Sequence, residues 1–347
     1  MEGVPGTGPY ALEGPMTSEG LTLVRNPRFR EWSPAAQPDG YVDRIEWTFG
    51  VSTADQVEAV AAGNADLTND SERSDQLDRL FVRFASRVHT SLNAQTQYLV
   101  LDTESPPFDD PKVRRALNLV IDRDRVVQIF GGGAFRPTCQ QLPPNFPGYE
   151  PYCPFTSDPG PGGKGLWSAP GVGIEEARAI VRRSGTAGMR VVFEYPPEYW
   201  TQGADMGKYM VELLGKLGYR GSVKRHSLEA FYDPENEFQM ALAAWSADFN
   251  AASNFVNGFF TCDAVFTPQS GFCDRRIDEM VEEATRVQID DPVAAGALWA
   301  EIDRAIVDQA PYDWLTNPNT IGFVSERVGN YQFSLQWGIL LNQLWVQ

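Results

Sequence analysis

An α/β protein of two lobes is the fold class that the sequence predicts. Segments of strand length alternate with amphipathic helices through the second half of the chain, an order typical of crossover units and a largely parallel sheet. The length of 347 residues exceeds one ordinary core, since roughly 150 residues per domain is usual. Apolar residues at 42% and charged residues at 22% give the balance of a globular chain.

Short strands and one clear helix are predicted for the N-terminal part of the chain. The predicted strands cover residues 21–25, 42–49 and 96–102. Residues 53–63 have the pattern of a helix, in which Thr53 is expected as the N-cap and Gln56 completes a capping box. Gly63 is expected to end this helix.

Two helices and a long loop are predicted for the middle of the chain. The first helix follows the turn at Pro106 and Pro107, and Asp122 suits the start of the second, which stops at a run of glycines. Residues 137–171 are dense in proline and glycine, and a cysteine pair is expected to tie them down as a wrapped loop.

Helices and strands alternate in the second half. The predicted helices cover residues 174–184, 206–217, 275–288 and 292–309. The predicted strands cover residues 189–195, 222–227, 238–245 and, in the tail, 320–324. The paired acids Asp109-Asp110 and Asp290-Asp291 stand just before prolines, so they are expected as helix caps.

The charge of the chain restricts its partners. A net charge of −17 and a pI of about 4.6 disfavour binding to nucleic acid and docking on anionic lipid. No window reaches the roughly 18 apolar residues of a membrane span. The N-terminus lacks the basic and apolar regions of a signal peptide, so the chain is expected to be cytosolic or a piece whose export signal lies upstream.

Four cysteines help to distinguish a cytosolic protein from a piece of an exported one. They form two sequence-local pairs, Cys139 with Cys153 and Cys262 with Cys273, and each pair brackets a loop rich in proline, glycine or polar residues. The spacings differ from those of Cys-x2-Cys zinc knuckles. Two loop-closing disulfides are the simplest interpretation, which would place the protein outside the cytoplasm. Three connectivities are formally possible, and four free thiols remain the alternative.

Motifs for catalysis and cofactor binding are missing from the sequence. It contains neither a Gly-x-Ser-x-Gly elbow nor a His-Glu-x-x-His helix, and its two histidines offer little for a triad or a metal site. No enzymatic activity and no cofactor or metal are therefore expected. A hydrolase such as a glycosidase with distant carboxylates stays open, although no residue points to it.

An aromatic residue and an acid follow the predicted strand over residues 238–245. Trp245 ends the apolar run, and Asp248 precedes a stretch rich in asparagine and small residues. A ring and a carboxylate at the mouth of a strand can hold a ligand that is part cation and part apolar body. The alternative is a core tryptophan beside a helix-capping aspartate.

Several segments, taken in order, resemble the extracellular solute-binding proteins of ABC importers, in the oligopeptide, dipeptide and nickel class known as family 5. The matching segments are residues 6–10 (Gly-Thr-Gly-Pro-Tyr), 23–27 (Leu-Val-Arg-Asn-Pro), 56–67, 107–123, 217–218 and 245–248. They span essentially all of the chain, and their order is more specific than any one of them.

The resemblance implies a periplasmic-binding-protein-like fold of type II, a clamshell that closes on its ligand. Residues 1–100 and 317–347 would form part of the first lobe, and residues 101–316 the complete second α/β lobe. An acid at the position of Asp248 commonly holds a peptide's amino group in that family, and the aromatic side chain matching Trp245 lines the pocket.

Three further residues are expected near this site. Phe249 and Asn250 are weaker neighbours of the acid, and Arg136 could face the cleft, with a solvated arginine as the alternative. The family usually carries a long region before the Gly-Thr-Gly-Pro-Tyr segment, so the chain resembles a C-terminal portion that lacks the N-terminal region.

The function implied by the resemblance is non-catalytic binding of a peptide or amino-terminated small molecule for an ABC import system. The expected partners are that ligand and, in the complete protein, the ABC permease subunits, with the membrane reached only through an upstream anchor. The complete protein would work in the cell envelope or periplasm. A ligand-sensing module of the same fold, attached to a regulatory protein, is the alternative.

Overall fold

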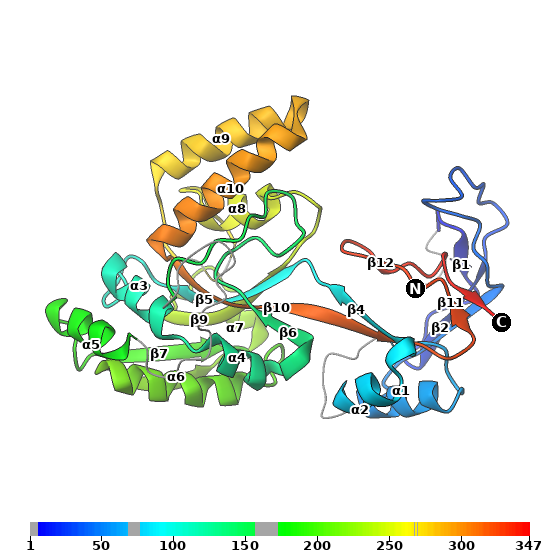
Figure 1. Cartoon of the computed structure of the whole chain (residues 1–347), viewed down its shortest axis with the longest axis horizontal. Helices are drawn as coiled ribbons and strands as arrows, with labels where there is room; N and C mark the ends of the chain where they lie inside the picture. The colour runs from blue at the N-terminus through cyan, green and yellow to red at the C-terminus, as the bar shows by residue number, and fades with distance from the viewer. Residues whose placement is uncertain (1–5, 69–76, 157–172, 267, 269) are drawn as a thin grey trace. The chain divides into compact units, whose positions relative to one another are not determined.

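Two compact units make up the chain in the computed structural model (Figure 1), which describes residues 6–68, 77–156, 173–266, 268 and 270–347. The first unit contains Met1–Ser91 and Asn319–Gln347, and the second contains Leu92–Pro318. The boundaries predicted from the sequence instead follow residues 100 and 316. The difference concerns strand β5, Gln95–Leu101, which pairs along its whole length with β9, Met240–Ser246, and so belongs to the second unit.

Short strands and helices build the first unit. Strands β1 Tyr10–Leu12, β2 Gly20–Arg25 and β3 Arg44–Thr48 form an antiparallel sheet in this order. The helices are α1 Thr53–Ala61, α2 Leu77–Arg83 and the 3-10 helix η1 Ala85–Arg87. Two short ribbons pair β11 Val328–Gly329 with β14 Trp345–Val346 and β12 Phe333–Ser334 with β13 Gly338–Ile339.

The buried guanidinium of Arg87 ties segments of the first unit that are distant in sequence. It donates to the carbonyl of Val60 at 2.8 Å and to the carbonyl of Val324 at 2.8 Å. Its ring neighbours are Phe84 and Phe323, whose centroids lie 4.9 and 4.8 Å from the guanidinium carbon. Because a buried cation needs hydrogen-bond acceptors, these carbonyls fix the end of α1 against the C-terminal segment.

The start of α1 differs by one residue from the prediction. Ser52, and not Thr53, is the N-cap, and its hydroxyl accepts the N–H of Asp55 at 3.2 Å. Ser52 has the extended backbone that an N-cap requires, whereas Thr53 is already helical. With Ser52 as the N-cap, the third helical residue is Asp55 and not Gln56, whose side-chain amide donates to the carbonyl of Val51.

A seven-stranded sheet forms the centre of the second unit. Its order is β4-β10-β5-β9-β7-β8, with β6 attached to β10. The strands not yet bounded are β4 Val88–Leu92, β6 Phe135–Pro137, β7 Arg190–Tyr195, β8 Arg220–Arg225 and β10 Tyr312–Phe323. β4 and β10 also continue into the first unit.

The prediction of a largely parallel sheet is wrong. β7 pairs in parallel with β8 and with β9, but β5 pairs antiparallel with β9 and β10, and β6 pairs antiparallel with β10. A single crossover helix joins β7 to β8, whereas two or more helices follow β5 and precede β10. The single crossover thus accounts for the parallel pair β7 and β8, whereas the longer connections around β5 and β10 do not fix strand direction in the same way.

Two groups of helices surround this sheet (Figure 1). The helices of the second unit are α3 Pro111–Val120, α4 Arg123–Phe130, the 3-10 helix η2 Gly132–Ala134, α5 Ile174–Arg183, α6 Gly203–Leu217, α7 Leu228–Phe231, α8 Ser253–Phe260, α9 Arg275–Asp290 and α10 Pro292–Gln309. α5 packs on α3 and α6, and α6 lies against β7 and β8, while α8, α9 and α10 pack together. Within the described ranges, none of the helices combines the length and apolar character needed to cross a membrane.

Both cysteine pairs are disulfide-bonded in the structure. Cys139 joins Cys153 with Cα atoms 5.1 Å apart, and Cys262 joins Cys273 at 4.4 Å. The first disulfide closes part of the loop predicted over residues 137–171, of which residues 157–171 lie outside the described residues. The simplest interpretation of the cysteine spacing thus agrees with the structure.

Candidate ligand-binding site

The C-terminal end of β9 carries Trp245. The strand pairs with β5, and Trp245 lies opposite Thr96 in that register. The half-buried indole donates its Nε1 hydrogen to Oδ1 of Asn254 at 3.0 Å. A strand end and a helix residue therefore fix the ring in one orientation.

Asp248 is joined to Trp245 through the same asparagine. The backbone N–H of Asp248 donates to Oδ1 of Asn254 at 3.0 Å, and the amide nitrogen of Asn254 donates to the Asp248 carboxylate at 3.4 Å. Asn254 is 6% exposed, whereas Asp248 is exposed to solvent. A buried amide on α8 thus holds an accessible carboxylate close to an indole.

Two phenylalanines complete the surroundings of the indole. The ring of Phe259, on α8, meets Trp245 edge-on with centroids 5.0 Å apart, and Phe266 stacks on it at 4.9 Å with an interplanar angle of 28°. Offset-stacked and edge-on contacts are the favourable geometries for aromatic pairs. Phe259 is buried and Phe266 keeps 37% of its surface exposed, so an aromatic surface stays accessible beside the carboxylate.

The remaining predicted site residues lie on the loop after Asp248 and on another strand. Phe249 is 50% exposed and Asn250 is also exposed, in the loop that follows Asp248. Arg136 lies on β6, where it is opposite Asn317 of β10, and its side chain is exposed. The structure therefore brings Trp245 and Asp248 together through Asn254 and leaves Arg136 on another strand.

The sequence patterns did not predict three residues around this centre, Asn254, Phe259 and Phe266. Asn254 and Phe259 belong to the helix that follows the loop, and an asparagine in the first turn of an apolar helix is the signal that could have identified Asn254. Phe266 gives no comparable signal, because its contact with Trp245 depends on a loop that folds back after α8.

The buried carboxyl groups of the second unit lie on other elements. Asp303, on α10, accepts the side-chain N–H of Gln140 at 2.7 Å and the backbone N–H of Gln141 at 3.2 Å, and burial raises its pKa to about 7. Burial also raises the pKa of Asp313, on β10, against the opposing effect of Arg123 and Arg114. In the described part of the chain, no group of three or more His, Cys, Asp and Glu side chains is placed to hold a metal ion.

Two curated relatives are periplasmic oligopeptide-binding proteins by name. The periplasmic oligopeptide-binding protein OppA of Salmonella typhimurium is 24% identical over 310 residues, which cover 86% of this chain and 54% of the relative. The OppA protein of Escherichia coli is 25% identical over 258 residues, which cover 72% of this chain and 44% of the relative. The chain thus spans about half the length of these relatives.

Solved structures share the fold. A peptide complex of the ABC transporter-associated periplasmic binding protein DppA from Helicobacter pylori superposes with a TM-score of 0.72 at 19% identity, covering 98% of this chain and 63% of that one. The chain accordingly has the periplasmic-binding-protein fold of type II.

The family profile matches a large part of the sequence. The profile described as "Bacterial extracellular solute-binding proteins, family 5 Middle" aligns with residues 1–267, which include β9 and the residues around Trp245 and Asp248. The chain belongs to the bacterial extracellular solute-binding proteins of family 5.

Proposed function

We propose that this chain binds a peptide or an amino-terminated small molecule, without catalysis, for an ABC import system. The carboxylate of Asp248 beside the indole of Trp245 carries the proposal. An ammonium group would donate charge-assisted hydrogen bonds to the carboxylate, while the adjoining apolar part of the ligand would cover the aromatic rings. The two OppA relatives, which are oligopeptide-binding proteins by name, support the same class of ligand.

The proposed place of action is outside the cytoplasm, with the permease subunits of the importer as partners of the complete protein. Two disulfides support an oxidising compartment. The net charge of −17 supports neither nucleic acid nor an anionic membrane surface as a partner.

The test is calorimetric titration of the chain with trialanine and with its N-acetylated form. Acetylation removes the positive charge, so the acetylated peptide should bind more weakly to the wild type. The substitution Asp248→Asn should weaken binding of trialanine by on the order of 2–4 kcal/mol, as expected when a charged group loses its partner. It should affect the acetylated peptide far less.

Asp290→Asn is the matched control. Asp290 is another exposed carboxylate of the same unit, at the end of α9, and its neutralisation changes the net charge equally. A similar loss of affinity in both variants would indicate a general field effect. Unchanged affinity in Asp248→Asn would remove this carboxylate from the site.

A further inference from the structure

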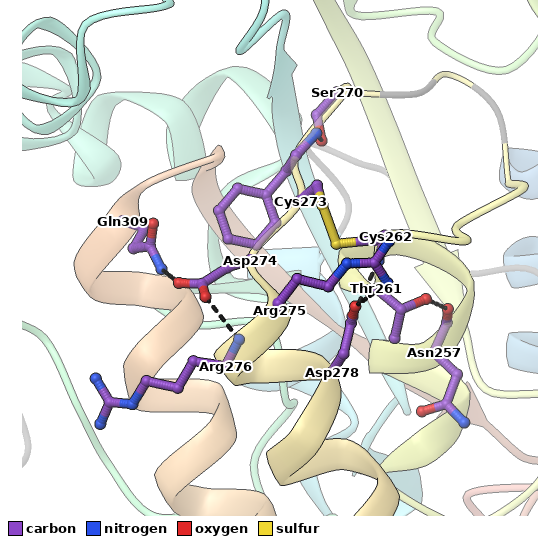
Figure 2. The surroundings of a disulfide bond; sticks show 11 residues. Asn257, Thr261, Cys262, Ser270, Cys273, Asp274, Arg275, Arg276, Asp278 and Gln309 are labelled. Carbon is purple, nitrogen blue, oxygen red and sulfur yellow. Dashed lines mark hydrogen bonds and ion pairs between the residues drawn. A yellow bond between two sulfur atoms is a disulfide. The ribbon is translucent and has the colours of Figure 1, made fainter.

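The loop between α8 and α9 is closed by a disulfide at its base. Cys262 and Cys273 join its two ends, and Figure 2 shows this bond beside the N-terminus of α9. The backbone N–H of Cys262 also donates to the carboxylate of Asp278 at 3.0 Å, in the first turn of α9. The base of the loop is therefore fixed covalently and by a charge-assisted hydrogen bond.

Two contacts hold the loop between its ends. The carbonyl of Ser270 accepts the N–H of Thr103 at 2.7 Å and the hydroxyl of Thr103 at 2.9 Å. The N–H of Phe266 donates to the carbonyl of Gly258, in α8, at 3.1 Å. These bonds set the position of the Phe266 backbone relative to α8 and to the residues after β5.

Gly258 provides the space for the ring of Phe266. A Cβ atom added at Gly258 would lie 1.9 Å from a ring carbon of Phe266, a distance at which the ring has to move. The ring consequently lies in a notch of α8 and stacks on Trp245. The position of the Phe266 side chain thus depends on the notch at Gly258, on the backbone hydrogen bond to α8 and on the closed loop.

We propose that Phe266 is a further ligand-binding residue and that the Cys262–Cys273 loop positions it. Phe266 and Trp245 then form one aromatic wall beside Asp248, and this inference rests on the proposed function. The wall would select ligands whose amino group is followed by an aromatic or bulky apolar side chain. Opening the loop would release Phe266 and leave Asp248 in place, because Asn254 holds that residue separately.

The indole N–H resonance of Trp245 tests the positioning without any ligand. In protein labelled with nitrogen-15, Trp245→Phe assigns the resonance, and the stacked Phe266 ring shifts it through its ring current. Phe266→Leu, the double variant Cys262→Ser/Cys273→Ser and Gly258→Ala should each move the resonance in the same direction. Phe266→Tyr should leave it in place, since the ring is kept.

Two matched controls separate positioning from general disturbance. Gly215→Ala changes a helical glycine of α6 whose added Cβ would meet no atom within 4 Å. Cys139→Ser/Cys153→Ser removes the other disulfide of the same unit. Both should keep the Trp245 resonance where it is. An unmoved resonance in Cys262→Ser/Cys273→Ser, with the folded spectrum retained, would overturn the positioning role.

The binding test uses two probes, trialanine and phenylalanyl-alanyl-alanine. The wild type should prefer the aromatic peptide, and Phe266→Leu should reduce this preference by about threefold to tenfold, the range that an aromatic pair contributes. A preference unchanged in Phe266→Leu, while Asp248→Asn still weakens both peptides, would overturn only the role of Phe266. Failure of the wild type to bind either peptide would overturn the proposed function itself.

Discussion

Asn254 shows how one buried side chain can organise a site. Its carbonyl oxygen accepts two N–H groups, the indole N–H of Trp245 and the backbone N–H of Asp248. A carbonyl oxygen has two lone pairs, so both bonds can form together. The distance between the ring and the carboxylate therefore depends on a third residue, which supplies neither group.

Replacement of Asn254 should disturb the fold as well as the site. Asn254→Ala leaves two donors without their acceptor, and we expect the free energy of unfolding to fall by about 1–3 kcal/mol. Urea unfolding followed by fluorescence measures this change. Asn257→Ala, an exposed asparagine on the same helix, is the control and should change stability by much less. Equal effects in the two variants would contradict the bridging role of Asn254.

Asp303 should make stability depend on pH. Burial raises its pKa from 3.8 to about 7, so the folded state keeps a proton that the unfolded state releases. The folded state binds more protons between these values, and stability therefore falls as pH rises from about 4 to about 7. The contribution integrates to on the order of 4 kcal/mol, at about 1.4 kcal/mol per pKa unit.

The comparison of wild type with Asp303→Asn measures that contribution. The variant cannot titrate at this position, so its urea unfolding free energy should change less than that of the wild type between acidic and neutral pH. Asp313 titrates in both proteins and cancels in the difference. Identical pH profiles for the two proteins would show that Asp303 is ionised throughout this range in the folded state.

At residue scale, the proximity of Trp245 and Asp248 could be predicted because the two residues are close in the sequence. Trp245 and Asp248 stand together after one strand, and both are held at the end of β9. Phe266 is far along the chain from Trp245, and only the turn after α8 and the closed loop bring their rings together. Such contacts depend on the path of the backbone, which residue patterns do not encode directly.

At the scale of elements, the bounds of α10 followed from its capping residues. The predicted helix over residues 292–309 is α10, because Asp291 accepts the N–H groups of Val293 and Ala294 and Pro292 occupies the first turn. The direction of the strands could not be predicted from local residue patterns. The apolar pattern of β5 is equally consistent with parallel and antiparallel neighbours, so the mixed sheet could not be predicted from it.

The neighbouring acids before α10 should differ in their effect on stability. Asp291→Ala removes the N-cap and should cost about 1 kcal/mol of the free energy of unfolding. Asp290→Ala is the control, since Asp290 is the exposed last residue of α9 and changes the net charge equally. Thermal or urea unfolding of both variants checks the difference. A loss of the same size in Asp290→Ala would indicate a charge effect without a specific cap.

At the scale of the whole molecule, the two units differ in how their sheets are buried. In β5 of the second unit, every residue after Gln95 is buried, whereas none of the residues of β1, β2 and β3 in the first unit is buried. The core of the first unit lies instead around residues such as Val57, Val60 and Phe323. Both disulfides also lie in the second unit.

Amide hydrogen exchange should therefore differ between the two sheets. Local opening costs least where few apolar contacts are lost, so amides of β2 should exchange on the order of 100-fold faster than those of β5. A mild reductant should speed exchange near Cys262 and Cys273, because the open loop has more conformational freedom, and should leave β2 unchanged. Mass spectrometry of peptides from each strand provides both measurements. Equal protection of β2 and β5 would show that the sheet of the first unit is stabilised by more than its own packing. Faster exchange of β2 in the reductant would show that the disulfides of the second unit control the stability of the first.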